Sequence, residues 1–277
     1  MKNVKETVMH GVFLIAACVS ILAVALICIF LFANGLPAIA KIGPIKFLTG
    51  IKWKPMNEIF GIFPMIVGSI YVTAGAILVG VPIGILCAVF MARFCPEGLY
   101  KLLKPVVNLL AGIPSIVYGL FGMLFFVNTL KWGFSVLAGA FTLSIMILPL
   151  IMRQTEEALK AVPDSYREGS FGLGAGKLRT VFRIILPSAV PGILSGVILG
   201  IGRIVGETAA LMYTAGTIAE IPANVMGSGR TLALHMYVLS CEGLHINQAY
   251  ATAVVLLLIV LVINAVSSFI AKRITKG

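Results

Sequence analysis

Two ionisable residues, Arg203 and Glu207, lie inside the apolar run GVILGIGRIVGETAALMYTAG, which is otherwise free of charge. An unpaired charge at the depth of a bilayer costs at least about 2.5–3.5 kcal/mol, so both side chains must face protein or water. A guanidinium in that setting can bind an anion, and a carboxylate nearby can adjust its strength and position. The alternative is an i, i+4 ion pair that neutralises itself, in the weaker Arg-before-Glu order. We favour the anion path, because two apolar residues would serve stability better.

Glycines indicate which face of this run is packed. At about 100° per residue, Gly192, Gly196 and Gly200 fall within roughly 80° of Arg203 and Glu207 on a helix. Small residues four positions apart let helix backbones approach closely in lipid. The spacing therefore predicts that the charged pair faces the interior of a helix bundle.

A second polar group lies in the run AGIPSIVYG, residues 111–119. Pro114 removes one backbone hydrogen bond from any helix formed there, and neighbouring Ser or Thr side chains can satisfy the freed carbonyl. Ser115 and Tyr118 add polar side chains at the same depth. We expect a kink or hinge there that lines the pore or takes part in gating.

The composition excludes several classes of protein. Of the 277 residues, 60% are hydrophobic and only 11% are charged, whereas a soluble domain has roughly a quarter charged. The net charge of +11 comes from basic residues at the ends of apolar runs, so nucleic-acid binding is not expected. The five cysteines and three histidines lack disulfide or metal-ligand spacing. No catalytic set is present, and the segment 172–177 lacks the first glycine and the final Ser or Thr of a phosphate-binding loop.

Six apolar runs are long enough to cross a membrane, since a helix needs about 20 such residues. They predict an all-α integral membrane protein with six transmembrane helices. Lys and Arg are concentrated on one side of these spans, which predicts that both termini and the loop at 153–188 are cytoplasmic. The first run is too long for the apolar region of a signal peptide, so we expect it to be retained. The spans are Gly11–Ala33, Pro64–Ala92, Pro105–Val127, Phe134–Met152, Ala189–Thr214 and Ala249–Ile270.

The loop at 153–188 contains a characteristic spacing. Five residues separate Glu168 from Gly174, nine more separate Gly174 from Ile184, and Leu186-Pro187 follows. This spacing resembles the EAA loop of ABC-importer permeases, although the triplet here is Glu-Gly-Ser. Together with AGIPSIVYG and GRIVGETAAL, it makes the chain similar to a phosphate (Pst) type permease of the A-subunit kind. The resemblance covers 61–277, a five-helix permease core, whereas 1–60 is less characteristic and forms the first span and first external loop.

The resemblance implies a type I permease bundle that translocates inorganic phosphate and is not itself catalytic. It implies a short coupling helix that docks on a cytoplasmic ATPase dimer, followed by a glycine-rich turn. It also implies a second homologous permease, an extracytoplasmic phosphate-binding protein and a prokaryotic cytoplasmic (inner) membrane. ATP and Mg would be bound by the ATPase, and no cofactor by this chain. The coupling residues are Asp164, Tyr166, Arg167, Glu168, Phe171 and Gly174.

Other functions stay open at this point. Within the importers, the alternative is a permease for another oxyanion such as molybdate or sulfate. A different class is an ion-coupled secondary carrier, which should contain inverted repeats and midplane broken helices. The chain contains no convincing internal repeat. An intramembrane enzyme is disfavoured because the spans contain no paired carboxylates or histidine clusters.

Overall fold

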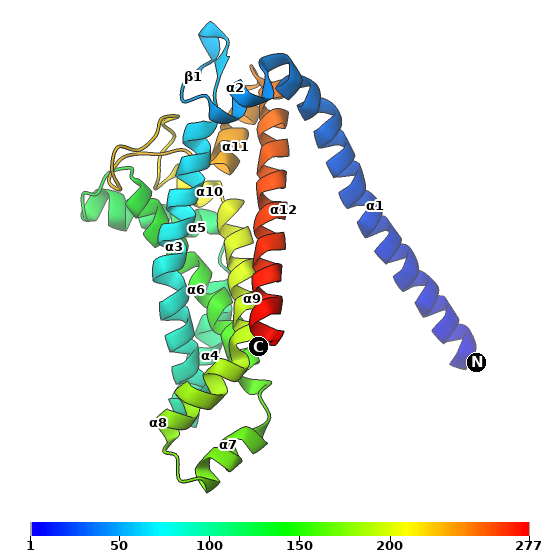
Figure 1. Cartoon of the computed structure of the whole chain (residues 1–277), viewed down its shortest axis with the longest axis vertical. Coiled ribbons are helices and arrows are strands. Elements are labelled where there is room, and N and C mark those ends of the chain that lie inside the picture. The colour runs from blue at the N-terminus through cyan, green and yellow to red at the C-terminus, as the bar shows by residue number, and fades with distance from the viewer. Residues whose placement is uncertain (1, 277) are drawn as a thin grey trace.

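A computed structural model describes residues 2–276, with side chains for 5–269 and Arg273. Within these residues, five helices are long and apolar enough to cross a membrane, and a bent pair can count as a sixth span. The all-α prediction with six spans is thus confirmed, with one span broken. Figure 1 shows the long helices other than the N-terminal one running side by side along the long axis. The five are α1 (Lys2–Ile42), α3 (Phe63–Val89), α6 (Val136–Lys160), α9 (Leu186–Val205) and α12 (Ile246–Lys276).

Shorter elements connect the long helices. The strands β1 (Trp53–Lys54) and β2 (Ile59–Phe60) pair antiparallel, with Trp53 opposite Phe60. The helices are α2 (Pro44–Thr49), α4 (Glu97–Gly112), α5 (Ser115–Gly122), α7 (Asp164–Gly172), α8 (Lys177–Thr180), α10 (Ala209–Met212) and α11 (Leu232–Glu242). One 3₁₀ helix and three π-helical segments complete the order. The 3₁₀ helix is η1 (Pro55–Asn57), and the π-helical segments are η2 (Phe90–Phe94), η3 (Met123–Thr129) and η4 (Val181–Ile185).

The centre of the bundle is the contact between α3 and α6. Gly80 brings the two helices together, since a Cβ there would lie only 2.9 Å from the Ile147 side chain. The Ser144 hydroxyl donates to the Ala76 carbonyl across this contact at 3.1 Å. Buried apolar side chains of α3, α5, α6, α9, α10 and α11 surround it. Small residues and a paired hydroxyl are what close helix packing in lipid requires.

The predicted glycine face of α9 packs against α6. A Cβ at Gly196 would lie 2.5 Å from the Gln154 Cβ, and one at Gly192 would lie 2.6 Å from the Ala158 Cβ. This places the two helix backbones close together over the half of α9 that follows the loop. The glycine stripe therefore marks a packed face, as its spacing predicts.

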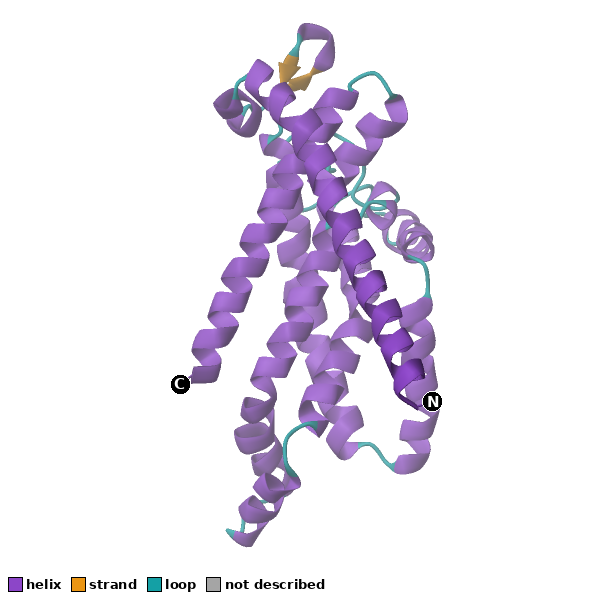
Figure 2. Cartoon of the chain, turned by 90° about the vertical axis from the view of Figure 1, so that its right-hand side faces the viewer, coloured by secondary structure: helices purple, strands orange, loops and turns teal. Residues whose placement is uncertain are grey.

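Helix α1 stands apart from the bundle over most of its length. Figures 1 and 2 show it meeting the other helices near its C-terminal end and diverging from there. The contact is with α12, where Phe30 and Tyr250 form an edge-to-face pair with centroids 5.6 Å apart. Gly35 allows it, because a Cβ there would lie 2.7 Å from the Tyr250 carbonyl oxygen. The division into 1–60 and 61–277 stays a prediction.

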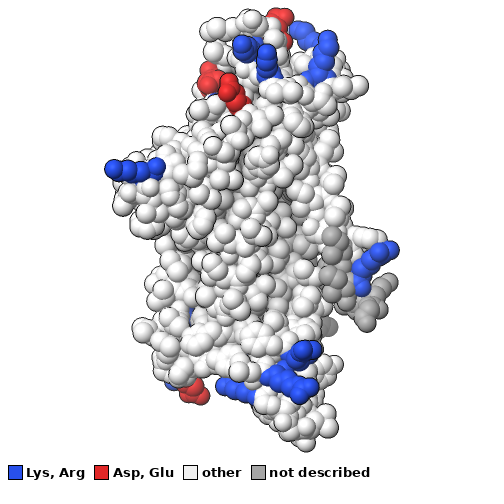
Figure 3. Space-filling view, turned by 60° about the vertical axis from the view of Figure 1, so that its left-hand side comes forward, with Lys and Arg blue, Asp and Glu red and all other residues white. Residues whose placement is uncertain are grey.

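Charged side chains lie toward the two ends of the molecule. On the face seen in Figure 3, the region between the ends is almost free of Lys, Arg, Asp and Glu. The end that carries α7 is called the α7 end here, and the opposite end, with α2 and the hairpin, the α2 end. Both chain ends point toward the α7 end. An uncharged band between charged ends is typical of a protein that crosses a bilayer.

The third predicted span, Pro105–Val127, is not one continuous helix. Helix α4 ends at Gly112, α5 begins at Ser115, and the two halves meet at 95°. Pro114 lies at the bend, where its ring and missing N–H prevent the helix from continuing. The hinge predicted from AGIPSIVYG is thus a full break.

The fifth predicted span, Ala189–Thr214, also ends earlier than expected. Helix α9 stops at Val205, and Gly206 to Thr208 separate it from the short helix α10. Glu207 lies in this break, and its Oε1 accepts from the backbone N–H of Ala210 at 3.1 Å. A carboxylate that satisfies a free donor at a helix start stabilises that start. Continuous helix periodicity was therefore the wrong expectation beyond Val205.

Candidate functional site: a charged helix end and a coupling helix

Arg203 and Glu207 do not form the i, i+4 pair that the sequence allows. Glu207 is buried, with 8% exposure, and bonds to Ala210. The Arg203 side chain is exposed, and within the described residues the two side chains form no salt bridge. The prediction that both face the bundle interior holds only for Glu207, because the helix ends between them. The self-neutralising ion pair is absent from this conformation, which leaves the charge of Arg203 open to an anion.

Tyr118 lies beside this charged end of α9. The positive charge of Arg203 is near enough to act on its phenol. The Tyr118 hydroxyl donates to the Leu110 carbonyl oxygen at 2.8 Å. In a continuous helix, the Leu110 carbonyl would accept from the backbone N–H of residue 114. Residue 114 is proline, which has no N–H. A side-chain hydroxyl thus satisfies the freed carbonyl, but it belongs to Tyr118 and not to a neighbouring Ser or Thr as expected. Ser115 starts α5 and is half-buried.

Close packing holds α5 against α10. A Cβ at Gly119 would lie 2.7 Å from the Ala210 Cα, so the two short helices touch backbone to backbone. Ala210 is also the donor to Glu207. The structure therefore brings Tyr118 and Glu207 into one region, with Arg203 at its exposed edge. Their assignment to a substrate path stays a prediction.

The predicted coupling helix forms at the α7 end. Helix α7 spans Asp164–Gly172 and follows Pro163, which is compatible with the start of a helix. Asp164 and Arg167 form an i, i+3 ion pair at 3.4 Å. Tyr166 and Phe171 are exposed by 52% and 44%, which leaves their rings free to contact another protein. Glu168 is exposed as well.

A glycine turn and one hydroxyl pair end the coupling helix. Gly174 has a φ of +81°, a left-handed conformation that side chains rarely adopt. Ser170 is buried, and its hydroxyl lies 2.8 Å from that of Thr180 on α8. This bond joins the two arms of the loop. The departure from the EAA triplet at position 170 thus has a structural role, which the spacing did not predict.

A buried carboxylate at the end of α6 was also not predicted. Glu156 is 3% exposed and accepts hydrogen bonds from Tyr100 and Lys104 of α4 and from Lys160 of its own helix. The i, i+4 spacing of Glu156 and Lys160 was visible in the sequence, but it is also common on solvated helices. Nothing in the sequence indicated that α4 would supply the other two donors.

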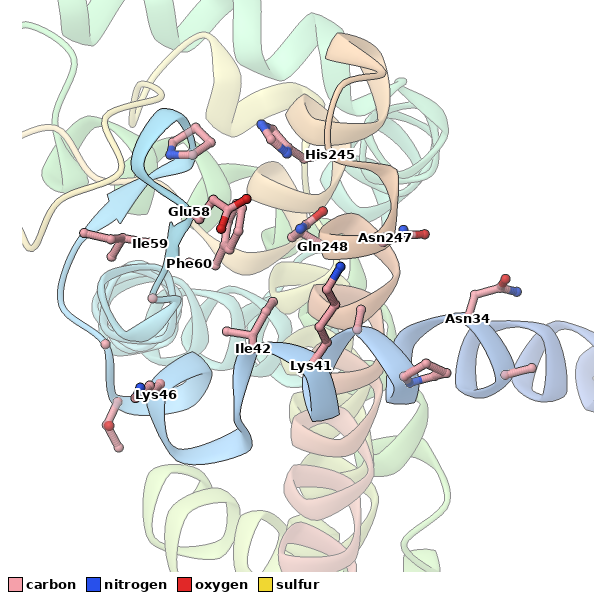
Figure 4. A pocket seen from close by; sticks show the side chains of 17 residues that line it. Asn34, Lys41, Ile42, Lys46, Glu58, Ile59, Phe60, His245, Asn247 and Gln248 are labelled. Atoms are coloured by element: carbon pink, nitrogen blue, oxygen red, sulfur yellow. The ribbon is translucent and has the colours of Figure 1, made fainter.

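Two cavities lie at opposite ends. At the α7 end, one of about 490 Å³ lies between the end of α6, Tyr166 of α7 and the start of α9. At the α2 end, one of about 1010 Å³ lies between α1, the hairpin and α12. Figure 4 shows Lys41, Glu58, His245 and Gln248 among its lining side chains. Its walls therefore carry both signs of charge and several amide groups.

The arrangement defines a class of protein: a polytopic membrane protein with a break in two of its spans and a short exposed helix at one end. The chain belongs to the family of binding-protein-dependent transport system inner membrane components, which matches residues 80–277. It is thus a permease subunit of an ABC transporter, a non-catalytic membrane component that works with an ATPase partner.

Relatives and a solved structure agree with this assignment. The chain is 31% identical to the probable ABC transporter permease protein YqgI of Bacillus subtilis strain 168, over 99% of this chain and 98% of that protein. It is 34% identical to the phosphate transport system permease protein PstA 1 of Mycobacterium tuberculosis strain CDC 1551, over 77% and 72%. The inward-facing MetNI methionine ABC transporter matches with a TM-score of 0.61 at 21% identity, over 80% and 99%. That likeness confirms the type I permease fold.

Proposed function

We propose that this permease moves inorganic phosphate into the cell, and the observation that supports this best is its 34% identity to a phosphate permease. Arg203 supports it physically, because its side chain is a free cation at the end of a membrane helix. A guanidinium binds phosphate oxygens with two parallel hydrogen bonds, which suits a tetrahedral oxyanion. Glu207 is then a positioning residue, which holds the start of α10 beside α5.

In this proposal the α7 end faces the cytoplasm of a prokaryotic cell, with both termini on that side. Helix α7 docks on an ATPase dimer, which binds ATP and Mg, through Tyr166, Phe171 and the charged residues Asp164, Arg167 and Glu168. A second, homologous permease covers the exposed Arg203 and completes the path. A phosphate-binding protein delivers its cargo at the α2 end, where the larger cavity opens. Rocking of the paired bundles then alternates access to the path.

Reconstitution in vesicles tests the proposal. The chain, its ATPase, a second permease and a loaded binding protein should import phosphate only when ATP is supplied. Excess molybdate or sulfate should not compete, and import of either in place of phosphate would overturn the substrate assignment. Gradient-driven uptake by this chain alone would overturn the class of transporter.

Arg203→Gln tests the proposed path. The variant should assemble normally but lose uptake, because the amide removes the only cation of α9 within the apolar run. Arg273→Gln, at the far end of α12, is the matched control and should transport normally. Normal uptake by Arg203→Gln would contradict the role of this side chain.

A further inference from the structure

Four side chains join α4 to the end of α6, and they are called the Glu156 cluster here: Tyr100, Lys104, Glu156 and Lys160. Glu156 Oε1 accepts from Tyr100 Oη at 2.6 Å and from Lys160 Nζ at 2.7 Å, and Oε2 accepts from Lys104 Nζ at 2.6 Å. Lys160 Nζ also donates to Tyr100 Oη at 2.9 Å. A buried carboxylate that is paired on both oxygens holds its partners in a defined geometry.

The last turn of α6 is also attached to η2, the segment that continues α3. The Arg93 guanidinium donates to the Leu159 carbonyl oxygen, one of the carbonyls left free at the helix C-terminus. Next to it, the Phe94 ring has Lys177 of α8 above it, with the ammonium 5.1 Å from the centroid. Both arms of the loop that carries α7 are therefore attached to the bundle. These attachments give a displacement of α7 a physical path to the elements that hold the two arms.

Helix α4 leads from the Glu156 cluster to the break at Pro114. Tyr100 and Lys104 lie in its first half, and Leu110 lies in its last turn. The Leu110 carbonyl accepts the hydrogen bond from Tyr118 at 2.8 Å, which links α4 to α5 across the bend. Gly119 of α5 then packs on Ala210 of α10. A continuous set of contacts thus joins the last turn of α6 to the region around Glu207.

We propose that Glu156 is a positioning residue that makes α4 move with α6 and α7, so that motion of the coupling helix reaches Tyr118 through α4. This is a second route in addition to the direct connection from the loop into α9. It rests on the proposed function, in which α7 docks on the ATPase. A set of contacts becomes a transmission route only if its members are energetically coupled, so the test must measure coupling.

The test compares Glu156→Gln with Glu157→Gln in the full complex in vesicles. Uptake and ATP hydrolysis are measured in the same sample. Glu156→Gln should lower uptake per ATP by about tenfold or more, because it removes the charge from three hydrogen bonds, while hydrolysis and copurification of the ATPase persist. Glu157 is exposed and should behave as wild type when substituted. An unchanged ratio for Glu156→Gln would overturn the inference.

Two further variants keep the test decisive if Glu156→Gln does not assemble. Tyr100→Phe removes one hydroxyl and should lower uptake per ATP by about two- to fivefold. Combined with Tyr118→Phe, it should lower the ratio no further than the stronger single variant, because both act on one route. Additive effects would overturn the route through α4. Import of another oxyanion would contradict only the phosphate assignment, and the same ratio measured with that oxyanion still tests Glu156.

Discussion

The Tyr118 hydroxyl donates to the Leu110 carbonyl oxygen at 2.8 Å and so bridges the 95° break between α4 and α5. The carbonyl would otherwise lack the helical partner that Pro114 removes. The same side chain thus pairs the freed carbonyl and holds a phenol within range of the charge of Arg203. In lipid, a broken helix is tolerated only where such freed groups are paired again.

Tyr118→Phe should therefore destabilise the bend. We expect the permease to lose about 0.5–1.5 kcal/mol of stability, because the Leu110 carbonyl is left with only the N–H of Ile113, at 3.3 Å, as a donor. Tyr71→Phe is the matched control, since the Tyr71 side chain is exposed on α3. Thermal unfolding of the purified complex in detergent measures both. Equal melting temperatures for the two variants would show that the hydrogen bond contributes nothing.

Gly196→Ala should loosen the contact between α9 and α6. The added methyl group would lie 2.5 Å from the Gln154 Cβ, so the helices must separate, at a cost of about 1–3 kcal/mol. Gly202→Ala, on the same helix, meets nothing within 4 Å and should be neutral or stabilising by up to about 1 kcal/mol. Melting temperatures that rank the two variants in the opposite order would contradict the packing.

Ser170→Ala should free the two arms of the coupling loop from each other. The Thr180 hydroxyl loses one partner, which costs about 1 kcal/mol, and α7 should become more susceptible to proteolysis. Ser165→Ala is an exposed control on the same helix. Copurification of the ATPase measures whether a looser α7 also binds its partner more weakly. Identical cleavage rates for the two variants would remove the role given to Ser170.

His235 predicts a pH dependence at the α2 end. The ring is fully buried, Arg230 Nη1 lies 3.1 Å from its Nδ1, and the Trp53 ring packs edge-to-face on it with centroids 4.2 Å apart. Arginine only donates, so Nδ1 accepts and the ring is neutral. Burial, and then the charge of Arg230, lower the pKa of His235 to about 3.

The sign of the effect follows from this lowered pKa. Between about pH 3 and 6.5 the unfolded chain binds a proton that the folded chain does not, so stability falls as the pH falls, by at most about 1.4 kcal/mol per unit. Above pH 6.5 this contribution is flat. Melting temperatures at pH 5 and 7.5 should differ more in wild type than in His235→Gln. His10→Gln is the control, because His10 is exposed. An equal pH dependence of the melting temperature in wild type, His235→Gln and His10→Gln would contradict the prediction.

The amino-acid sequence by itself determined the features that depend on local composition and spacing. Apolar, uncharged runs of about 20 residues are long enough to cross a bilayer, and in lipid a helix pairs all of its own backbone groups, so the spans and the all-α class followed from hydropathy. The short helix at 164–172 was expected from the family resemblance, and the close packing of the face that carries Gly192 and Gly196 followed from their i, i+4 spacing. The family assignment followed from motifs that are contiguous in the chain.

Only the tertiary structure decided where two of the spans end and which groups the polar side chains bond to. Helix α9 stops at Val205, Glu207 bonds forward to Ala210 at the start of α10, and Tyr118 rather than Ser115 donates to the carbonyl freed by Pro114. Glu156 meets Tyr100 and Lys104 from positions more than fifty residues earlier. Such contacts depend on how separate helices are placed in space. A rule based on spacing along the chain describes only neighbours within one helix, so it cannot predict contacts between helices.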